Sequence, residues 1–233
     1  MLKSANGPKY RHEYKYLISS AQIEILKTRI RGLMLPDPHT GAGGMYSVRS
    51  VYFDDYHNRC YYENENGNDP RAKYRIRIYN CSAGRISLER KKKERGRTCK
   101  ESVLIDYEQA GLLLKGRYTA PVSEAPQLLQ GLYADMMVNR MKPVIIVDYD
   151  RFPFVYPLGN VRVTFDTRLT SSRETESFFE RENSGRPVLP TGMQLLEVKF
   201  DEYLPDVIYR ALQLDSLRQT AFSKYYLSRK FTM

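Results

Sequence analysis

The chain has 233 residues, of which 42% are hydrophobic, so it is long enough and apolar enough to bury a globular core. Its 37 Lys and Arg residues outnumber 27 Asp and Glu residues, and the formal net charge of +10 favours an anionic partner. Nucleic acid, an anionic membrane and phosphorylated small molecules all remain open on charge alone. Three cysteines without CxxC spacing argue against a disulfide framework and against a zinc site.

The sequence also bears on the cellular compartment. The segment MLKSANGPKY lacks the apolar stretch of a signal peptide. The longest aliphatic run, residues 144–147, is far shorter than the roughly 20 residues of a membrane helix. We therefore expect a cytoplasmic protein without a membrane span.

The first predicted elements are a strand over residues 10–18 and an amphipathic helix that starts at an N-cap formed by Ser19-Ser20 and ends near Gly32. The Pro and Gly content of residues 35–44 predicts a loop, which leads into a strand over residues 48–55.

Period-two patterns then predict further strands over residues 72–79, 85–92, 98–105, 143–154, 161–168 and 193–200. Helices are predicted over residues 106–115, 124–139, 204–214 and 222–230. The polar residues 171–190 are predicted to form a mobile linker.

Eight strands joined by turns or short helices predict an α+β fold. Its expected centre is an eight-stranded antiparallel β barrel or tunnel with peripheral helices. No repeat or low-complexity linker divides the chain, so we expect a single domain over residues 1–233, with a core of about residues 9–230.

One stretch, KYRIRIY, places cations at every second position: Lys73, Arg75 and Arg77. Because side chains alternate between the faces of a strand, these three leave one face and the intervening apolar residues leave the other. A single strand of this kind is more typical of an amphipathic surface strand whose basic side faces water.

Other predicted strands repeat the pattern, with ionic or polar residues on one face. These residues are Arg11, Glu13 and Lys15; Arg85, Glu89 and Lys91; Tyr149 and Arg151; Arg162, Thr164 and Asp166; and Glu197 and Lys199. If the barrel turns these faces inward, its interior is polar and cationic. Burying so many cations requires a bound polyanion, water and a few carboxylates, so a ligand with several phosphates fits.

Eight segments carry a family resemblance: HEYKY, SVYFDD, YRIRIY, LERKKK, VDYDRFPF, VRVTFDT, LLEVKF and FSKYYLS. In this order the chain resembles the VTC-type polyphosphate polymerase domain of the triphosphate tunnel metalloenzyme (CYTH-like) superfamily, from about residue 9 to residue 230. The resemblance implies a tunnel that binds a nucleoside triphosphate such as ATP. With Mn²⁺ or Mg²⁺ it would transfer the terminal phosphoryl group to a growing inorganic polyphosphate.

Matching positions imply nine substrate-binding cations: Lys15, Arg75, Arg77, Lys91, Lys100, Arg151, Arg162, Lys199 and Lys224. The resemblance implies catalytic roles for six of them: Lys15, Arg75, Arg77, Lys91, Arg151 and Lys224. Glu197 matches the metal-binding glutamate. We interpret Glu13 and Glu89 as ion-pair partners, and Asp166 stays open between the two roles.

Two departures from the superfamily qualify this interpretation. Its hydrolases often begin with ExExK, whereas Arg11 stands at the first of these positions, which favours the more cationic polymerase type. The inositol-polyphosphate-sensing SPX domain and the membrane helices of the eukaryotic polymerases do not occur in this sequence, so we expect neither that regulation nor coupled translocation.

Three alternatives stay open: a triphosphatase of the same fold, a non-catalytic module that binds polyphosphate or another polyanion, and a nucleic-acid-binding protein. The last would carry its cations on an exterior stripe, and no recognised motif supports it, so we expect no nucleic-acid partner. A P-loop and a kinase glycine motif do not occur. The oligomeric state stays open.

Overall fold

The structure is a computed structural model that describes residues 10–118, 122–182 and 184–232. Its strands are β1 His12–Ser19, β2 Leu35–Pro36, β3 Tyr46–Asp54, β4 Arg71–Tyr79, β5 Ser82–Glu94, β6 Arg97–Ile105, β7 Lys142–Tyr156, β8 Val161–Ser172, β9 Arg186–Pro187 and β10 Met193–Phe200. Its α-helices are α1 Ser20–Arg31, α2 Arg59–Glu65, α3 Tyr107–Leu114, α4 Gln127–Asn139, α5 Asp206–Ala211 and α6 Lys224–Lys230. Short 3₁₀ helices are η1 Val122–Glu124, η2 Leu158–Asn160, η3 Thr175–Phe179 and η4 Leu214–Ser216.

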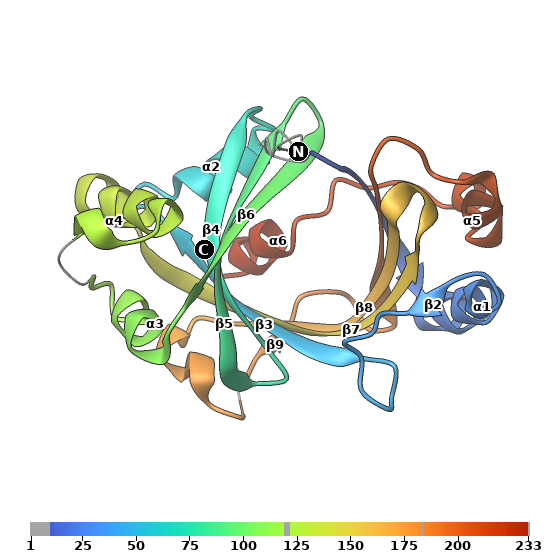
Figure 1. Cartoon of the computed structure of the whole chain (residues 1–233), viewed down its shortest axis with the longest axis horizontal. Helices are drawn as coiled ribbons and strands as arrows, with labels where there is room; N and C mark the ends of the chain where they lie inside the picture. The colour runs from blue at the N-terminus through green and yellow to red at the C-terminus, as the bar shows by residue number, and fades with distance from the viewer. Residues whose placement is uncertain (1–9, 119–121, 183, 233) are drawn as a thin grey trace, which may run out of the picture.

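Eight of the strands form one curled antiparallel sheet in the order β1-β10-β8-β7-β3-β4-β5-β6, and Figure 1 shows its curvature. The short strands β2 and β9 pair with β7 and β8. The two ends of the path meet at Arg11 and Thr98, whose backbones exchange hydrogen bonds of 2.9 and 3.0 Å. The predicted α+β fold with an eight-stranded antiparallel barrel is confirmed.

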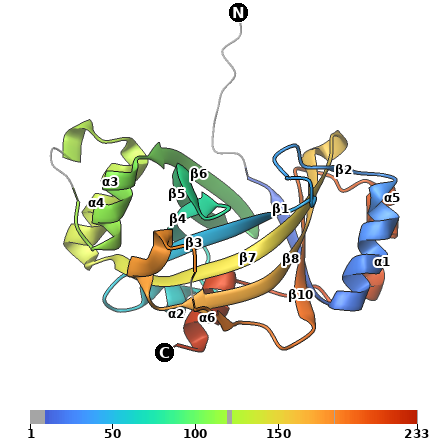
Figure 2. The same cartoon turned by 90° about the horizontal axis from the view of Figure 1, so that it is seen from below.

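One apolar core covers the outer face of β3, β4 and β5 beneath α3 and α4 (Figures 1 and 2). Val51, Ile76 and Leu88 point outward from these strands and are fully buried. They contact a core that includes Leu113 of α3 and Leu129 of α4. Each fully buried side chain of this kind contributes roughly 1.5–3 kcal/mol, so this packing fixes the outward direction of the apolar face.

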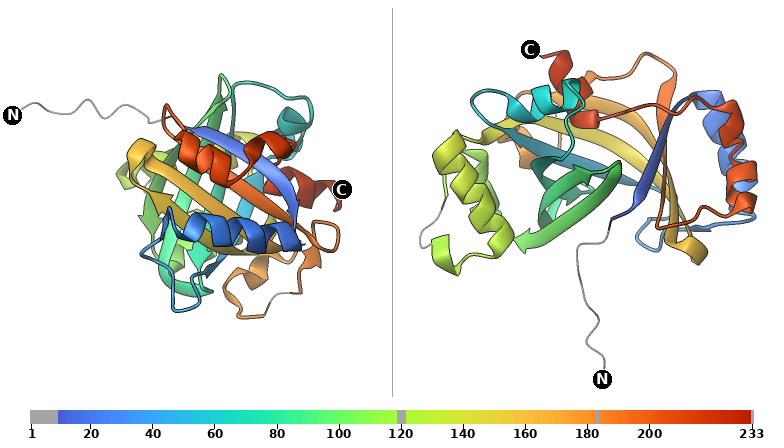
Figure 3. Two further views of the ribbon diagram at one scale, coloured as in Figure 1. Left: turned by 90° about the vertical axis from the view of Figure 1, so that its right-hand side faces the viewer. Right: turned by 90° about the horizontal axis from the view of Figure 1, so that it is seen from above.

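A second apolar core lies on the other side of the barrel beneath α1 and α5 (Figures 1 and 3). It contains Ile18, Val163 and Val198 from β1, β8 and β10, together with Ile30 of α1 and Ile208 of α5. Because neighbouring residues on a strand face opposite ways, burying these residues outward turns the ionic residues between them toward the interior.

The inner face also carries apolar residues, which we call the apolar plug. Its members are Val48, Ile145, Val147, Leu195, Phe222 and Tyr225. The last two come from the C-terminal segment and α6, which lies within the ring of strands in Figure 1 and packs on β7 and α2. The barrel interior is therefore apolar in one region and ionic in another.

Asp54 at the end of β3 anchors the helices beside the plug. This fully buried carboxylate accepts hydrogen bonds from the backbone N–H of Cys60 at 2.8 Å and of Tyr61 at 3.2 Å, and from the hydroxyl of Tyr225. Burial and the adjacent carboxylate raise the pKa of the Tyr225 hydroxyl. A single side chain thus holds both α2 and α6 against the sheet.

Two parts of the sequence-based prediction are wrong. Residues 171–190 do not form a simple linker: β8 continues into them, η3 and β9 lie within them, and Phe178 is fully buried. Arg49, itself buried, donates hydrogen bonds to the backbone carbonyls of Phe178 at 3.1 Å and of Glu180. In addition, α2 was not predicted.

None of the helices in the described residues is both long enough and apolar enough to cross a membrane.

Candidate active site

The ionic part of the interior encloses a cavity of about 870 Å³, which we call the central cavity. Seven of the nine predicted substrate-binding cations line it: Lys15, Arg75, Arg77, Lys91, Arg151, Lys199 and Lys224. They come from β1, β4, β5, β7, β10 and α6. Strands distant in sequence therefore bring the predicted residues together.

Glu197 is buried among three of these cations. Its Oε2 lies 3.1 Å from Lys199 Nζ and 3.4 Å from an Nη of Arg151, and its Oε1 lies 3.7 Å from Lys15 Nζ. Burial alone would raise the pKa of this carboxyl group, but Lys199, Lys15 and other cations hold that pKa well below its usual value. Glu197 is therefore ionised and shared by several cations.

Asp166 on β8 holds Arg151 and Lys224 in fixed positions. Two guanidinium nitrogens of Arg151 lie 2.7 Å from the two carboxylate oxygens, and Lys224 Nζ lies 2.7 Å from one of them. Burial opposes ionisation, but these cations lower the pKa of Asp166. In this structure Asp166 is an ion-pair partner that orients the two predicted catalytic cations.

Glu89 plays the same part for Arg75. The Nε and Nη2 atoms of Arg75 lie 2.7 and 2.6 Å from Glu89 Oε2, and Lys100 Nζ lies 3.0 Å from Oε1. Against the effect of burial, these cations lower the pKa of Glu89. The ion-pair interpretation of Glu89 agrees with the structure.

Glu13 on β1 also forms ion pairs with lysines of the cavity. Its Oε2 lies 2.8 Å from Lys91 Nζ and 3.5 Å from Lys15 Nζ. These distances agree with the interpretation of Glu13 as an ion-pair partner. Burial lowers the pKa of Lys91, although Glu13 opposes this shift. Both lysines therefore face the cavity with their ammonium groups already positioned.

Tyrosine hydroxyls supply a second set of contacts that the sequence did not reveal. Arg77 donates to Tyr149 Oη at 3.1 Å and to Ser50 Oγ at 3.0 Å, and Arg75 donates to Tyr52 Oη at 3.0 Å. Burial would raise the pKa of Tyr52, but Arg75 and neighbouring cations lower it to about 7. These two tyrosines therefore orient arginines that the sequence analysis predicts to bind substrate.

Lys73 is a cavity cation that the sequence analysis left out of the site. It lines the cavity, and its Nζ donates to Ser223 Oγ, the N-cap of α6, at 3.0 Å. Within the described residues it forms no ion pair with a carboxylate. Burial and the nearby lysines lower its pKa to about 7, against the opposing effect of Tyr52. Its alternation with Arg75 and Arg77 along the strand could have indicated that Lys73 faces the cavity. It was left out of the predicted site because only the two arginines were matched to the family.

Two predicted cations do not line the cavity. Lys100 is half exposed and contacts Glu89. Arg162 contacts Asp37 at 2.8 Å and the hydroxyl of Tyr46 at 2.7 Å. Both sit on the predicted strands, but their side chains are engaged outside the cavity lining, so their role in substrate binding stays a prediction.

A metal ion would find few protein ligands in the central cavity. The described residues contain no cluster of three or more His, Cys, Asp or Glu side chains arranged to hold one. Glu197 offers hard carboxylate oxygens, which suit Mn²⁺ or Mg²⁺, but cations already surround both oxygens. Glu197 could therefore supply one ligand to such a metal, whose other ligands would have to come from outside the described residues.

Comparison with known proteins agrees with this architecture. The profile of the VTC domain family matches residues 10–233, and the chain belongs to that family. The curled antiparallel sheet is the fold that the resemblance to the triphosphate tunnel metalloenzyme (CYTH-like) superfamily implies. None of the curated proteins matches the chain significantly in sequence.

Two solved structures share the fold at low sequence identity. One is a proposed adenylate cyclase from Bacillus halodurans, with a TM-score of 0.55, 16% identity, and coverage of 93% of this chain and 95% of that chain. The other is a proposed adenylyl cyclase from Hippeastrum with a dominant triphosphatase activity, with a TM-score of 0.55, 12% identity, and coverage of 95% and 96%. At these identities the likeness establishes the fold alone.

Proposed function

We propose that the chain is a metal-dependent polyphosphate polymerase that transfers the terminal phosphoryl group of ATP to the end of an inorganic polyphosphate. The convergence of seven predicted phosphate-binding cations on a cavity of about 870 Å³ is the observation that supports this most. A cavity of this size falls within the roughly 300–1,000 Å³ of sites that enclose ligands of nucleotide size.

In the proposed reaction, a terminal oxygen of the polyphosphate chain forms a bond to the γ-phosphorus of ATP. The bond between that phosphorus and the oxygen bridging to the β-phosphate breaks, and ADP leaves with the electron pair. The acceptor oxygen is already anionic near neutral pH, so no general base is needed. Catalysis then depends on aligning the two phosphates and on neutralising charge in the transition state.

The cavity residues suit these two tasks. Arg75 and Arg151 are held by Glu89 and Asp166, so their planar guanidinium groups are oriented before substrate arrives. Lysines such as Lys15 carry compact charges on flexible stems and can follow a chain as it lengthens. A bound polyanion would replace part of the carboxylate contacts with phosphate oxygens.

Glu197 is the residue we propose to hold Mn²⁺ or Mg²⁺. When bound, the metal would neutralise charge on the phosphate oxygens. In the absence of substrate, Lys15, Arg151 and Lys199 share the carboxylate. Binding of metal and triphosphate together would move these cations toward the phosphates, so metal affinity should depend on the nucleotide.

The test is to incubate the purified chain with ATP and Mn²⁺ and to resolve the products on a gel that separates phosphate chain lengths. Glu197→Gln should reduce the ladder at least about tenfold, because it removes a charged ligand. Glu202→Gln is the matched control, since its side chain is 75% exposed and lies outside the cavity lining. Absence of a ladder in the unaltered protein would refute the proposed polymerase.

The same gel addresses a second candidate, a triphosphatase acting on inorganic triphosphate or a nucleotide. The dominant triphosphatase activity of the Hippeastrum protein, which shares this fold, favours it. In that case water replaces the polyphosphate acceptor and orthophosphate is the only new product. A chain without turnover that still binds tripolyphosphate would be a polyanion-binding module.

A further inference from the structure

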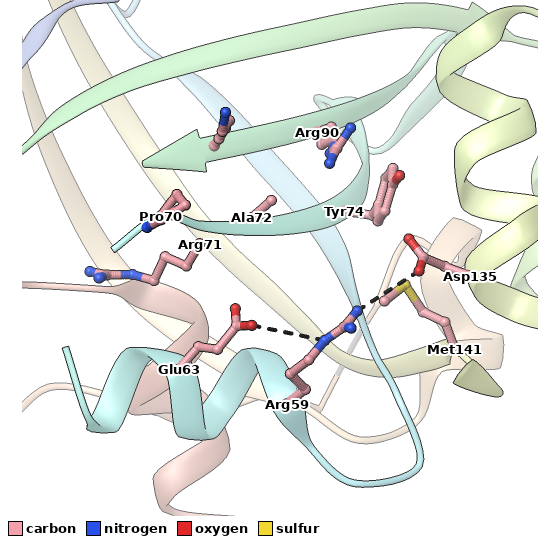
Figure 4. Close-up of a pocket in the computed structure, with 10 residues that line it drawn as sticks. Arg59, Glu63, Pro70, Arg71, Ala72, Tyr74, Arg90, Asp135 and Met141 are labelled. Carbon is pink, nitrogen blue, oxygen red and sulfur yellow. Dashed lines mark ion pairs between the residues drawn. The ribbon is translucent and has the colours of Figure 1, made fainter. Parts of the chain in front are cut away.

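A second cavity, which we call the outer pocket, lies on the opposite side of β4 and β5 from the central cavity. It has a volume of about 210 Å³ and is bounded by α2, by the outer face of β4 and β5, and by the end of α4 (Figure 4). Its charged lining residues are Arg59, Glu63, Arg71, Arg90, Lys92 and Asp135. Four cations thus face two carboxylates.

The two carboxylates of the outer pocket are both engaged by Arg59. The Nε of Arg59 lies 3.9 Å from Glu63 Oε1, and its Nη2 lies 3.8 Å from Asp135 Oδ1, as the dashed lines in Figure 4 mark. At the rim, Lys92 pairs with Glu94 at 2.8 Å. Within the described residues, the pocket's other two cations, Arg90 and Arg71, form no direct ion pair with these carboxylates, although Arg71 lies near enough to Glu63 to interact with it electrostatically.

Arg90 is the cation whose position calls for a ligand. Its guanidinium lies 5.6 Å from the centre of the Tyr74 ring, and the two side chains lie close together in Figure 4. Its Nε is buried and has no hydrogen-bond partner among the residues that the structure describes. Glu101 lies opposite Arg90 on β6, but within the described residues Arg90 forms no ion pair. An unpaired donor of this kind costs roughly 1–3 kcal/mol unless something outside the chain accepts its hydrogen bond.

The outer pocket also adjoins the central cavity. Arg71 and Ala72, at the start of β4, line both. Along this strand Lys73 and Arg75 line the central cavity while Tyr74 lines the outer pocket. The Nη1 of Arg71 donates to the carbonyl of Asn68 at 2.5 Å, and within the described part of the chain it forms no ion pair with a carboxylate. A polyanion emerging past this rim would meet Arg71 before Arg90.

We propose that the outer pocket binds a phosphoryl oxyanion, with Arg90 as its main ligand and Arg71 at the rim shared with the central cavity. The planar guanidinium fork matches two phosphate oxygens. A volume of about 210 Å³ is too small for a nucleotide but accommodates a phosphate group. The group is either free orthophosphate or part of a polyphosphate chain that leaves the central cavity, and only the second source rests on the proposed function.

Binding measurements on matched variants test the proposal. Arg90→Gln removes the proposed ligand, Arg75→Gln weakens the central cavity, and Arg85→Gln removes an exposed charge from β5 outside both cavities. Equilibrium dialysis with radiolabelled orthophosphate is done in the Arg75→Gln background. Adding Arg90→Gln should lower orthophosphate affinity roughly tenfold or more, whereas adding Arg85→Gln should change it little. Arg90→Lys should retain part of the affinity, and thermal melting checks that all variants fold.

Tripolyphosphate and long-chain polyphosphate separate the two sources. If Arg90→Gln in the otherwise unaltered chain weakens binding of the long chain but not of tripolyphosphate, the pocket holds a polyphosphate tail. If only orthophosphate binding falls, the pocket holds the free anion. Equal binding of every ligand by folded Arg90→Gln and Arg85→Gln proteins overturns the proposal. If Arg75→Gln does not change the affinity for tripolyphosphate, that result counts against the proposed function. It does not contradict the proposed anion site in the outer pocket.

Discussion

The central cavity and the apolar plug occupy the same inner face of one barrel, but opposite chemistry builds them. Along β7 the inward residues change from Val147 in the plug to Arg151 in the cavity, and along β10 they change from Leu195 to Glu197. The plug buries apolar side chains and is complete without a ligand. The cavity instead buries cations that repel one another, and carboxylates shared between them offset this repulsion.

This difference implies that the plug contributes mainly to the stability of the fold and the cavity mainly to ligand binding. Hydrophobic burial stabilises the folded state in proportion to the area removed from water, and the plug adds to two outer cores that do the same. Altering a buried ion pair seldom lowers the free energy of unfolding by much if the remaining charged group keeps another partner. The reason is that the cost of desolvating the two charges offsets most of their attraction. We therefore expect plug variants to affect unfolding and cavity variants to affect ligand affinity.

The largest effect should come from Phe222→Ala in the plug. Phe222 is buried where the plug borders the central cavity, and truncating such a side chain lowers the free energy of unfolding by about 3–5 kcal/mol. Phe231→Ala is the matched control, because Phe231 is 68% exposed and should change that free energy little. Urea unfolding measures both. Equal unfolding midpoints for the two variants would show that the plug contributes nothing to stability.

Arg75→Ala should give the opposite result in the cavity. Loss of a charged phosphate contact should lower tripolyphosphate affinity roughly 10–100-fold, while the free energy of unfolding changes by less than about 1 kcal/mol. The reason is that Glu89 keeps Lys100 at 3.0 Å and Arg77 at 4.0 Å, and one repelling cation is removed. Calorimetry and urea unfolding are compared with Arg85→Ala. Normal binding with a large loss of stability would make Arg75 a structural residue.

The inward direction of the cations could be predicted from sequence because alternation is a local property of a strand. Apolar residues such as Ile76 and Val198 must be buried against helices, so their neighbours face inward. Closure of the barrel and the convergence of the rows on one cavity follow from pairing between distant strands, such as β1 with β10. The family resemblance supplied that long-range information.

Other features depend on contacts that no local pattern encodes. The segment forming α2 has no clear apolar period, and Asp54, beyond its N-terminus, holds its backbone in place. Phe178 is buried in a segment whose surrounding polarity predicted a linker. Arg162 lies on a predicted strand, but Asp37 of a preceding loop engages it outside the cavity lining. For Phe178 and Arg162 the deciding partner, Arg49 or Asp37 respectively, is distant in sequence.

The smallest effect concerns pH. Burial lowers the pKa of Lys73 to about 7 and that of Lys199 to about 8, although Tyr52 and Glu197 respectively oppose these shifts. Above these values both lysines are neutral in the folded protein and still protonated in the unfolded chain. The unfolded chain then binds more protons, so the stability of the ligand-free protein should rise as pH increases from about 7 to about 10.

Affinity for a polyanion should change in the opposite direction. A phosphate ligand favours charged ammonium groups, so tripolyphosphate affinity should fall by up to roughly tenfold from about pH 7 to about pH 9 as Lys73 loses its proton. Ionisation of Tyr52, whose pKa is lowered to about 7 against burial by Arg75 and other cations, acts in the same direction. Lys73→Met should flatten the curve, and Lys142→Met, at an exposed position outside the cavity, should preserve it. Because tripolyphosphate ionises identically in both titrations, only the difference between the two slopes reports on Lys73. Parallel slopes would mean that this ammonium group does not contact the ligand, and Lys73 would then serve only to hold Ser223 and α6.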